Sequence, residues 1–316
     1  MAEAAYPVPE PRLSAALIDE INAVVLGKHA EVTTLVAAVL AGGHVLLEDV
    51  PGVGKTLLAK AAARALGLSF GRVQCTSDLM PADLTGVEVY DPRTGEWAFR
   101  PGPLFHSLVL VDELNRTTPR TQSALLEAMA EAQVTVDGET RPLPRPFVVI
   151  ATQNPSTDAG TFPLVPGQRD RFMVSLSVGP LHRAAERELL QGTGGVEHLM
   201  SISRVVEDDE LDELRDDVRR IHVADSILDH LLDLRDAVVS ELADTAVLSP
   251  RATQDARDLS RAFAFISGRD FVTPDDVDLA VRYAWSHRVQ RADKGSLEAA
   301  QSRLITMVGH VTPPPV

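Results

Sequence analysis

Residues 49–57 place two glycines, a lysine and a threonine at the spacing of a phosphate-binding loop. The stretch reads Asp-Val-Pro-Gly-Val-Gly-Lys-Thr-Leu and follows a short apolar run. Triphosphate binding requires backbone N–H groups at a helix start, a lysine for the β and γ phosphates, and a hydroxyl for Mg²⁺. The candidate nucleotide-binding residues are therefore Val50, Pro51, Gly52, Val53, Gly54, Lys55, Thr56 and Leu57.

Asp49 departs from the strict form of this loop, which has glycine at that position. A carboxylate close to bound phosphates would repel them, so Asp49 must either point away from the phosphates or weaken their binding. The sequence leaves both outcomes open, and the affinity for ATP is the property that Asp49 would change.

Two acids end a second apolar run, Leu108 to Val111, and supply the remaining groups for hydrolysis. With the phosphate loop upstream, Asp112 is suited to hold Mg²⁺ through water, and the hydroxyl of Thr56 would be the other metal ligand. Glu113 is suited to polarise the attacking water. The pair predicts phosphoryl transfer from a nucleoside triphosphate to water.

A parallel sheet would bring these groups together. Three apolar runs end in polar residues, and segments with helical spacing lie between them. Strands that alternate with helices predict a parallel sheet whose ligand site lies outside the carboxyl ends of the strands. The predicted strands cover 44–48, 107–111 and 147–151, and the predicted helices cover 13–40, interrupted at Gly27, together with 57–66 and 121–132.

The region from Gly86 to Pro103 alternates apolar and polar residues around Asp91-Pro92-Arg93-Thr94-Gly95. This pattern predicts a β-hairpin. Its aromatic residues, Trp97 and Phe99, would either contact a partner or pack against the adjacent helix. The sequence leaves these two alternatives open.

From Pro180 onward the pattern changes to a series of helical stripes. Leu211, Leu214, Val218 and Ile221 form one apolar stripe, and further stripes follow. We therefore predict two domains. An α/β nucleotide-binding domain with an N-terminal extension would cover residues 1–180, and a small all-α domain would cover 181–316.

Composition excludes several classes of protein. The 316 residues include 30 Lys plus Arg and 45 Asp plus Glu, so the net charge is −15. This balance is opposite to the one that neutralises nucleic-acid phosphates, and no nucleic-acid partner is expected. The single cysteine, Cys75, cannot form an internal disulfide and is expected to be a buried apolar side chain.

The longest apolar stretch, Leu35 to Ala41, is far shorter than the ~20 residues of a membrane span, so no membrane insertion is expected. Residues 1–11 have neither a basic start nor an apolar centre, which is unlike a signal peptide. We predict a cytoplasmic location.

Taken in order, these motifs resemble the AAA+ ATPases and, within them, the MoxR family. The resemblance implies an α/β fold: a P-loop AAA+ core of a parallel sheet sandwiched by helices, with the hairpin inserted in helix 2, followed by an all-α lid. It also implies ATP and Mg²⁺ as cofactors. The motifs are Glu48 to Thr56, Asp78 to Gly86, Gly102 to Phe105, Val111 to Arg116, Gln122 to Met129, Ala151 to Pro155, Asp170 to Phe172 and Ser249 to Arg251.

The resemblance assigns catalytic roles to three residues besides Glu113. Asn154 would be the polar sensor that helps to place the attacking water. Arg171 would be the arginine finger that reaches the γ-phosphate bound by a neighbouring subunit and stabilises transition-state charge. Arg251 would open a lid helix after Ser249-Pro250 and contact the γ-phosphate from the second domain.

The region of the finger departs from the family pattern. That pattern resembles Leu-Pro-Glu-Ala-Gln-Leu-Asp-Arg-Phe, whereas residues 164–172 read Leu-Val-Pro-Gly-Gln-Arg-Asp-Arg-Phe. Arg169 replaces an apolar residue, so either Arg169 or Arg171 could be the finger. Arg171 is favoured because it keeps its Asp and Phe neighbours. A finger that acts between subunits implies a closed ring, and we expect a hexamer.

Two functions remain open. The resemblance implies an ATPase that couples ATP binding and hydrolysis in a ring to the remodelling, maturation or activation of partner proteins, often with a von Willebrand factor A domain partner. The alternative is a nucleotide-gated assembly scaffold with negligible turnover, which Asp49 and the altered finger region motivate. A third function, that of a nucleic-acid motor, would need a basic surface and is disfavoured by the charge.

Overall fold

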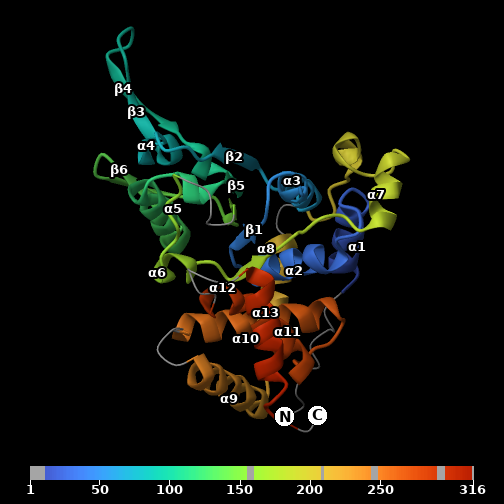
Figure 1. Cartoon of the computed structure of the whole chain (residues 1–316). Coiled ribbons are helices and arrows are strands. Elements are labelled where there is room, and N and C mark those ends of the chain that lie inside the picture. The colour runs from blue at the N-terminus through green and yellow to red at the C-terminus, as the bar shows by residue number, and fades with distance from the viewer. Residues whose placement is uncertain (1–10, 155–159, 208–209, 243–247, 290–295, 315–316) are drawn as a thin grey trace, which may run out of the picture.

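The computed structural model describes residues 11–154, 160–207, 210–242, 248–289 and 296–314. A five-stranded sheet with its helices forms one half of the molecule, and a group of helices from the C-terminal part forms the other (Figure 1). The first ten residues of the predicted N-terminal extension lie outside the described residues, as does Pro155 of the motif that contains Asn154.

All five strands of the main sheet are parallel, as predicted. The three predicted strands are present and adjacent to one another, and two strands that the sequence analysis missed complete the sheet at its edges. In spatial order the strands are β2 (Phe70–Gln74), β5 (Leu108–Asp112), β8 (Val148–Gln153), β1 (Val45–Glu48) and β9 (Val174–Leu176).

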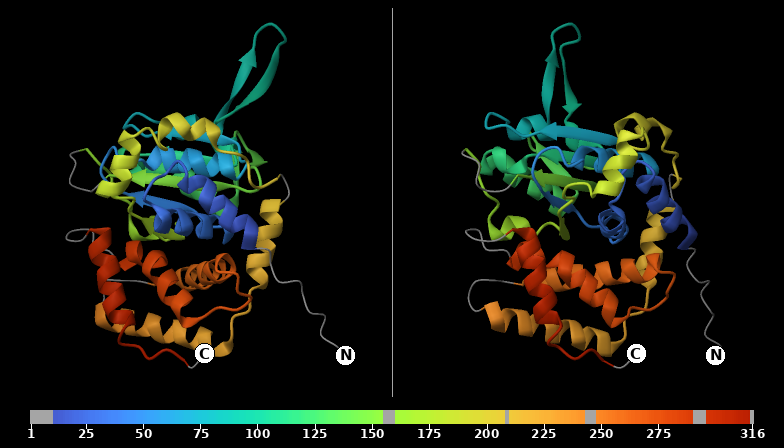
Figure 2. Two further views of the ribbon diagram at one scale, coloured as in Figure 1. Left: turned by 90° about the vertical axis from the view of Figure 1, so that its right-hand side faces the viewer. Right: turned by 45° about the vertical axis from the view of Figure 1, so that its right-hand side comes forward.

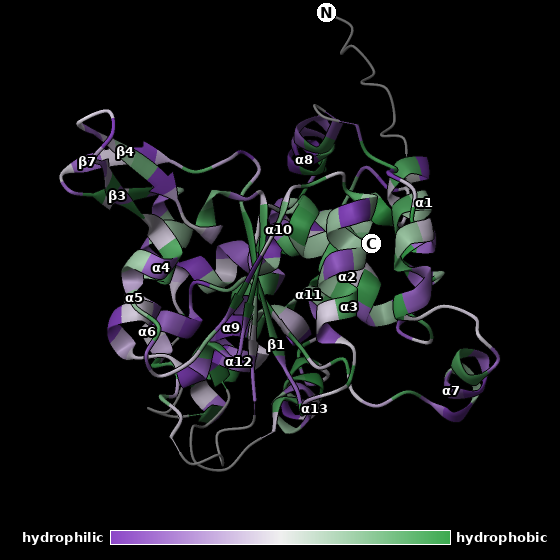
Figure 3. Cartoon of the chain, turned by 90° about the horizontal axis from the view of Figure 1, so that it is seen from above, coloured by the Kyte–Doolittle hydropathy of each residue, from purple (hydrophilic) through white to green (hydrophobic). Residues whose placement is uncertain are grey.

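Helices cover both faces of this sheet. Val45 and Leu47 of β1 point to one face, and Leu46 points to the other, because successive side chains of a strand alternate. Figure 3 shows the central strands as predominantly hydrophobic, which is typical of a sheet buried on both sides. The first face carries α1 (Pro11–Asn22), α2 (His29–Leu40) and α3 (Lys55–Ala65), and the second carries α4 (Pro81–Thr85) and α5 (Pro119–Glu131).

The predicted β-hairpin is present and directly follows α4. It consists of β3 (Gly86–Asp91) and β4 (Glu96–Pro101), and Asp91 pairs with Glu96 across the turn. It projects away from the body of the molecule (Figure 2). A second hairpin was not predicted: β6 (Gln133–Val136) and β7 (Glu139–Pro142) join at Asp137-Gly138, a dipeptide that is itself a strong hairpin signal.

The two aromatic residues of the first hairpin have different environments. Phe99 packs edge-on against Phe105 with ring centroids 5.4 Å apart, and the guanidinium of Arg141 lies 4.1 Å from the centroid of the Phe99 ring. Trp97 is 68% exposed and lies beside Tyr90. Of the alternatives that the sequence left open, packing therefore applies to Phe99, whereas Trp97 lies on the surface.

The C-terminal part is helical, as predicted, and the stripe from Leu211 to Ile221 is buried. Its apolar core is continuous with the core on the α1–α3 face of the sheet. Among the described residues, no helix has both the length and the apolarity needed to cross a bilayer. The remaining helices are α6 (Pro166–Arg169), α7 (Arg183–Leu190), α8 (Glu210–Arg220), α9 (Asp225–Leu242), α10 (Pro250–Ile266), α11 (Pro274–Ala284), α12 (Ser286–Val289) and α13 (Leu297–Val308), with 3₁₀ turns η1 (Pro103–Phe105), η2 (Leu114–Arg116) and η3 (Val196–Ser201).

The segment after Pro180 contacts the half of the molecule that contains the sheet. The N–H of Gly195 donates to the carbonyl of Val24 at 2.9 Å, and the N–H of Val205 donates to the carbonyl of Ala65 at 2.8 Å. The domain boundary between residues 180 and 181 stays a prediction.

His44, directly before β1, is a buried histidine held in one tautomer. Its Nδ1 accepts a hydrogen bond from the N–H of Val149 at 3.0 Å, so Nε2 carries the proton and donates to the carbonyl of Met129 at 3.2 Å. Burial lowers the pKa of His44 from 6.5 to about 4, and the charges of Arg251 and Arg215 contribute in the same direction. The folded protein therefore contains neutral His44.

The buried, neutral state of His44 predicts that the folded protein loses stability in mild acid. Because the folded-state pKa lies below the unfolded value, the contribution of neutral His44 is complete above pH 6.5 and is lost as the pH falls towards 4. Relative to His44→Gln, which does not titrate, we expect the native chain to lose up to about 3 kcal/mol of unfolding free energy over this range. Urea unfolding of both proteins at several pH values between 7 and 4 measures this change. An equal difference between them at pH 7 and at pH 4 would contradict it.

Candidate active site

The phosphate loop connects β1 to α3, in the strand, loop and helix order that the sequence predicts. Gly52 and Gly54 have φ angles of 89° and 99°, a left-handed conformation that glycine adopts without strain. Apart from each glycine and its two neighbours in the chain, no atom of the described residues lies within 4 Å of the place where a Cβ would be at either glycine. The loop thus leaves open space at the N-terminus of α3, where the N–H groups of the first helical turn have no partner within the helix.

Lys55 is the first residue of α3, and its side chain turns back over the loop. It is 9% exposed, and its Nζ donates to the carbonyls of Asp49 at 2.7 Å and Val50 at 3.1 Å. Burial lowers the pKa of Lys55, and the nearby carboxylates of Asp49, Asp112 and Glu113 oppose this shift. An ammonium group beside open space and backbone N–H groups fits the binding of phosphate oxygens.

The carboxylate of Asp49 points away from the loop. Its Oδ1 accepts hydrogen bonds from the Ser177 hydroxyl at 3.0 Å and from the N–H of Gly179 at 3.2 Å, and its Oδ2 accepts one from the N–H of Val178. This arrangement favours the first of the two outcomes that the sequence left open, because residues 177–179 hold both carboxylate oxygens. These contacts also join the phosphate loop to the chain that leaves β9.

Asp112 ends β5 and is 6% exposed. Its Oδ2 accepts a hydrogen bond from Arg72 Nε at 2.8 Å and lies 2.7 Å from Arg72 Nη2 in an ion pair, and its Oδ1 accepts a hydrogen bond from the Thr152 hydroxyl at 3.5 Å. The sequence analysis missed both partners. Arg72 lies on β2, a strand with no clear apolar run, and Thr152 directly follows the predicted third strand, 147–151, and belongs to β8.

Glu113 follows Asp112 in a conformation that is unusual for a residue with a side chain. Its φ is 57°, in the left-handed region, where a non-glycine residue costs about 1–3 kcal/mol. The hydroxyl of Thr152 stabilises this turn by accepting a hydrogen bond from the Glu113 N–H at 2.8 Å. This conformation aims the carboxylate along the carboxyl edge of the sheet.

Three donors orient the carboxylate of Glu113. Oε1 accepts a hydrogen bond from Asn154 Nδ2 at 2.9 Å, and Oε2 accepts one from Gln74 Nε2 at 3.0 Å. Arg116 Nε lies 3.3 Å from Oε2. The structure thus brings together Glu113 and Asn154, both predicted, and adds Gln74 and Arg116, which were not. Gln74 ends β2 directly opposite Asp112, so a prediction of β2 would have identified it.

Cys75 follows Gln74 and is buried, as expected. Burial raises the pKa of its thiol to about 12, and the charges of Asp112 and Glu113 add to this shift. The thiol is therefore protonated at neutral pH and is not a reactive thiolate.

Comparison with known proteins agrees with this arrangement. Residues 44–174 match the family described as "ATPase family associated with various cellular activities (AAA)", and residues 235–304 match an AAA lid domain. Chaperone MoxR1 of Mycobacterium tuberculosis is 34% identical, over 94% of this chain and 85% of that protein. The chain belongs to the MoxR family of AAA+ ATPases.

Two further relatives cover nearly the whole chain. The uncharacterized protein YeaC of Bacillus subtilis is 38% identical, over 91% of this chain and 90% of that protein. A crystal structure from Cytophaga hutchinsonii has a TM-score of 0.85 and 31% identity, and covers 96% of both chains. The sheet with its hairpin is thus the AAA+ core of a MoxR-family protein, and the C-terminal helices are its lid.

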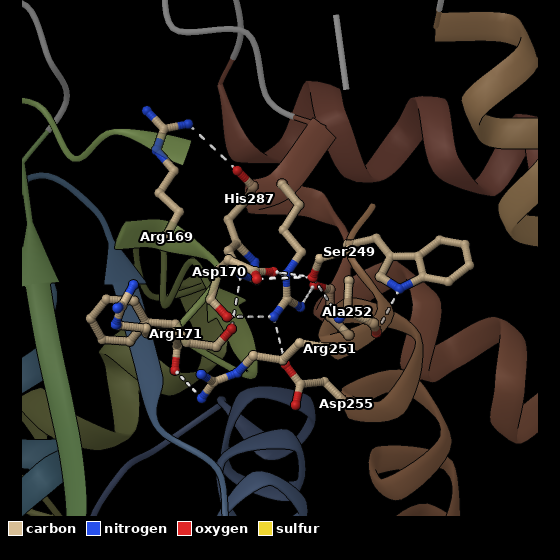
Figure 4. A network of polar contacts seen from close by, with 12 residues as sticks. Arg169, Asp170, Arg171, Ser249, Arg251, Ala252, Asp255 and His287 are labelled. Carbon is tan, nitrogen blue, oxygen red and sulfur yellow. Dashed lines mark hydrogen bonds and ion pairs between the residues drawn. The ribbon is translucent and has the colours of Figure 1, made fainter. Parts of the chain in front are cut away.

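The arginines predicted from the MoxR resemblance lie at the junction of core and lid (Figure 4). Arg171 Nη1 donates to the carbonyl of Gly167 at 2.7 Å, and Arg251 Nη2 donates to the carbonyl of Arg171 at 3.4 Å. Arg169 Nη1 donates to the carbonyl of His287 at 3.5 Å. Arg251 opens the lid helix α10, whose N-cap is Ser249, as predicted.

The donor set also fits Mg²⁺ together with a bound triphosphate. Within the described part of the chain, no group of three or more His, Cys, Asp or Glu side chains is placed to hold a metal ion. Mg²⁺ at nucleotide sites takes only one or two protein oxygens, and phosphates and water supply its other ligands. The hydroxyl of Thr56 and the carboxylate of Asp112 are the protein oxygens that would hold it.

Proposed function

We propose that this MoxR-family protein hydrolyses ATP to ADP and phosphate with the help of Mg²⁺. In this proposal residues 50–57 bind the nucleotide, Thr56 and Asp112 hold Mg²⁺, and Lys55 binds the β and γ phosphates. Glu113 accepts a proton from the attacking water, and Asn154 helps to place that water.

The observation that carries this proposal is the orientation of Glu113. Donors from two other strands of the sheet, Gln74 of β2 and Asn154 after β8, hold the two oxygens of its carboxylate. A carboxylate fixed in this way at the end of β5, with Lys55 close by, has the chemistry of a general base beside bound phosphates. A carboxylate at a solvated loop start would not need a strained backbone and three oriented donors.

We further propose a ring of subunits, a hexamer, in which Arg171 reaches the nucleotide of the adjacent subunit and Arg251 contacts the nucleotide of its own. The place of Arg171 at the core–lid junction supports its action on the adjacent subunit, because a residue that acts on a neighbour has no need to contact its own phosphate loop. The relative named Chaperone MoxR1 supports a chaperone-like role. We propose that this role is the remodelling, maturation or activation of partner proteins, among them one with a von Willebrand factor A domain, as the family resemblance implies.

The nucleotide-gated scaffold is the second candidate. Two features motivate it, Asp49 and the altered finger region. The hydrogen bonds of the Asp49 carboxylate to residues 177 and 179 weaken the first of these reasons. The other motive remains, because Arg169 occupies the finger region and its guanidinium contacts the lid.

Steady-state phosphate release from ATP and Mg²⁺, measured over a range of protein concentrations, tests this function. Because the site is completed between subunits, we expect the activity per subunit to rise at least about tenfold as rings assemble. An activity per subunit that is constant with concentration would overturn the ring and the trans finger but not the ATPase. No phosphate release at any concentration, with ATP still bound, would support the scaffold.

A further inference from the structure

The residue between the two candidate finger arginines is tied to the lid. Asp170 is the C-cap residue of α6, and its carboxylate accepts hydrogen bonds from the Ser249 hydroxyl at 2.9 Å and from Arg288 Nε at 2.8 Å. Both donors belong to the lid: Ser249 is the N-cap of α10, and Arg288 lies on α12. The core residue next to Arg171 therefore takes its partners from the other half of the molecule (Figure 4).

Arg288 links this carboxylate to a second one. Its side chain is 2% exposed, and its Nη2 donates to Asp255 Oδ2 at 2.5 Å. Its Nη1 donates to the carbonyl of Ala284 at 2.5 Å. A buried guanidinium thus lies between a core carboxylate and a lid carboxylate, and removal of either acid would leave a buried charge poorly compensated. The planar, rigid fork of arginine also sets the relative position of its partners, which the flexible side chain of lysine would not do.

The backbone beside Asp170 is held in the same way. Arg288 Nη2 donates to the carbonyl of Asp170 at 3.0 Å, and Arg251 Nη2 donates to the carbonyl of Arg171 at 3.4 Å. His287 Nε2 lies 3.0 Å from the carbonyl of Phe172, and burial lowers the pKa of His287 well below its usual value, so the neutral ring donates this proton. Three consecutive carbonyls of the finger segment therefore accept hydrogen bonds from three lid side chains.

The guanidinium of Arg171 itself takes no part in these contacts. It donates to Gly167, within its own helical turn. Among the contacts described above, the lid thus holds the backbone on which Arg171 stands, whereas the guanidinium contacts its own helical turn. The finger segment and the lid thus meet in the Asp170 cluster, which consists of Asp170, Ser249, Arg251, Asp255, His287 and Arg288.

We propose that Asp170 and Arg288 are positioning residues through which the lid of one subunit sets the position of Arg171 at the nucleotide of the next subunit. The inference rests on the proposed function, because it needs a finger that acts between subunits. A lid that moves with the nucleotide state of its own subunit would carry the finger segment with it through the Asp170 cluster, since these contacts form one continuous polar network. The finger would then be in place for the neighbour in only one lid position.

Mixed rings test this coupling. Arg171→Ala subunits have an intact site but no finger, and Glu113→Gln subunits have a finger but an inactive site. Activity in the mixture therefore arises only where the finger of a Glu113→Gln subunit reaches the site of an Arg171→Ala subunit. We expect Asp170→Asn placed in the Glu113→Gln subunit to lower this rescued rate at least about tenfold, since a shift of about 1 Å at a catalytic group can cost 100-fold. The same change in the Arg171→Ala subunit, which has no finger to position, should alter the rate less than about twofold.

The asymmetry separates positioning from a role in folding. A destabilised protein would lower the rescued rate whichever subunit carried the substitution, and such a symmetric result would overturn the inference. Arg288→Lys, which keeps the charge but loses the fork, should show the same asymmetry with a smaller loss. ATP binding, measured by titration with a fluorescent analogue, should be unchanged in every variant.

Asp276→Asn is the matched control. Asp276 is buried and forms an ion pair with the partly exposed Arg269, 2.5 Å from Nη1 to Oδ2, entirely within the lid. Its loss should have the same effect in either kind of subunit. If the two parent subunits give no rescue at all, the trans finger is wrong and this inference falls with it. If they give rescue but Asp170→Asn acts symmetrically, only the coupling is wrong.

Discussion

Replacing Glu113 with glutamine is expected to lower ATP turnover at least about 100-fold and to leave ATP affinity within about threefold, because a general base contributes 100-fold to 10,000-fold. The amide has the size of the carboxylate but cannot accept a proton from water. It also replaces one acceptor oxygen with an NH₂ group, so Asn154 and Gln74, which donate to different oxygens of Glu113, cannot both keep their present hydrogen bonds. The phosphate loop does not depend on Glu113, which is why binding should persist.

Single-turnover phosphate release and equilibrium nucleotide binding measure the two quantities separately. Glu127→Gln is the matched control: this glutamate lies on the exposed face of α5, and its substitution should alter neither quantity. Unchanged turnover in Glu113→Gln would show that another group activates the water. A parallel fall in affinity and turnover would assign Glu113 to binding.

Replacing Arg171 with alanine should lower turnover at least about 1,000-fold, the scale found for arginine fingers in phosphoryl transfer. Replacing Arg169 should lower it less than about tenfold, because its Nη1 donates to the lid carbonyl of His287 at 3.5 Å and a hydrogen bond of this kind is worth about 1 kcal/mol. The contrast follows from their surroundings: Arg169 contacts His287, whereas Arg171 contacts its own helical turn.

Turnover is best compared at protein concentrations where the native chain is fully assembled, with the assembly state of each variant checked by light scattering. Addition of Glu113→Gln subunits should restore activity to Arg171→Ala, because their fingers are intact. A larger loss in Arg169→Ala than in Arg171→Ala would move the finger to Arg169. Loss in Arg171→Ala without restoration by mixing would place its action within its own subunit.

Much of the fold follows from local patterns in the chain. The strand, loop and helix around Gly52 and Gly54 was predictable because only glycine accepts the positive φ angles of that loop without strain. The apolar run that ends at Asp112 and Glu113 predicts a buried strand, and the structure has β5 there. The helix start at Ser249-Pro250 was equally visible, because its cap is local in sequence.

The missing strands have a common physical cause. β2 reads Phe-Gly-Arg-Val-Gln and has no continuous apolar run. Gly71 has no side chain, and it is buried because Pro103 and His106 pack against its backbone. β9 has three residues, too few to show a period. Since β2 was missed, Arg72 and Gln74 could not be placed beside Asp112 and Glu113.

The sequence by itself thus determined which groups are available for the proposed chemistry, since a triphosphate site demands a glycine loop, a lysine, a hydroxyl and acids at set local spacings. Only the tertiary structure decided how these groups are directed. The carboxylate of Asp49 turns to Ser177, and Asp170 turns to Ser249 and Arg288, because partners distant in the chain satisfy their buried oxygens. Local spacing contains no information about such partners, since the pairing of β1 with β9 brings Asp49 to Ser177, and the contact of core and lid brings Asp170 to Ser249 and Arg288.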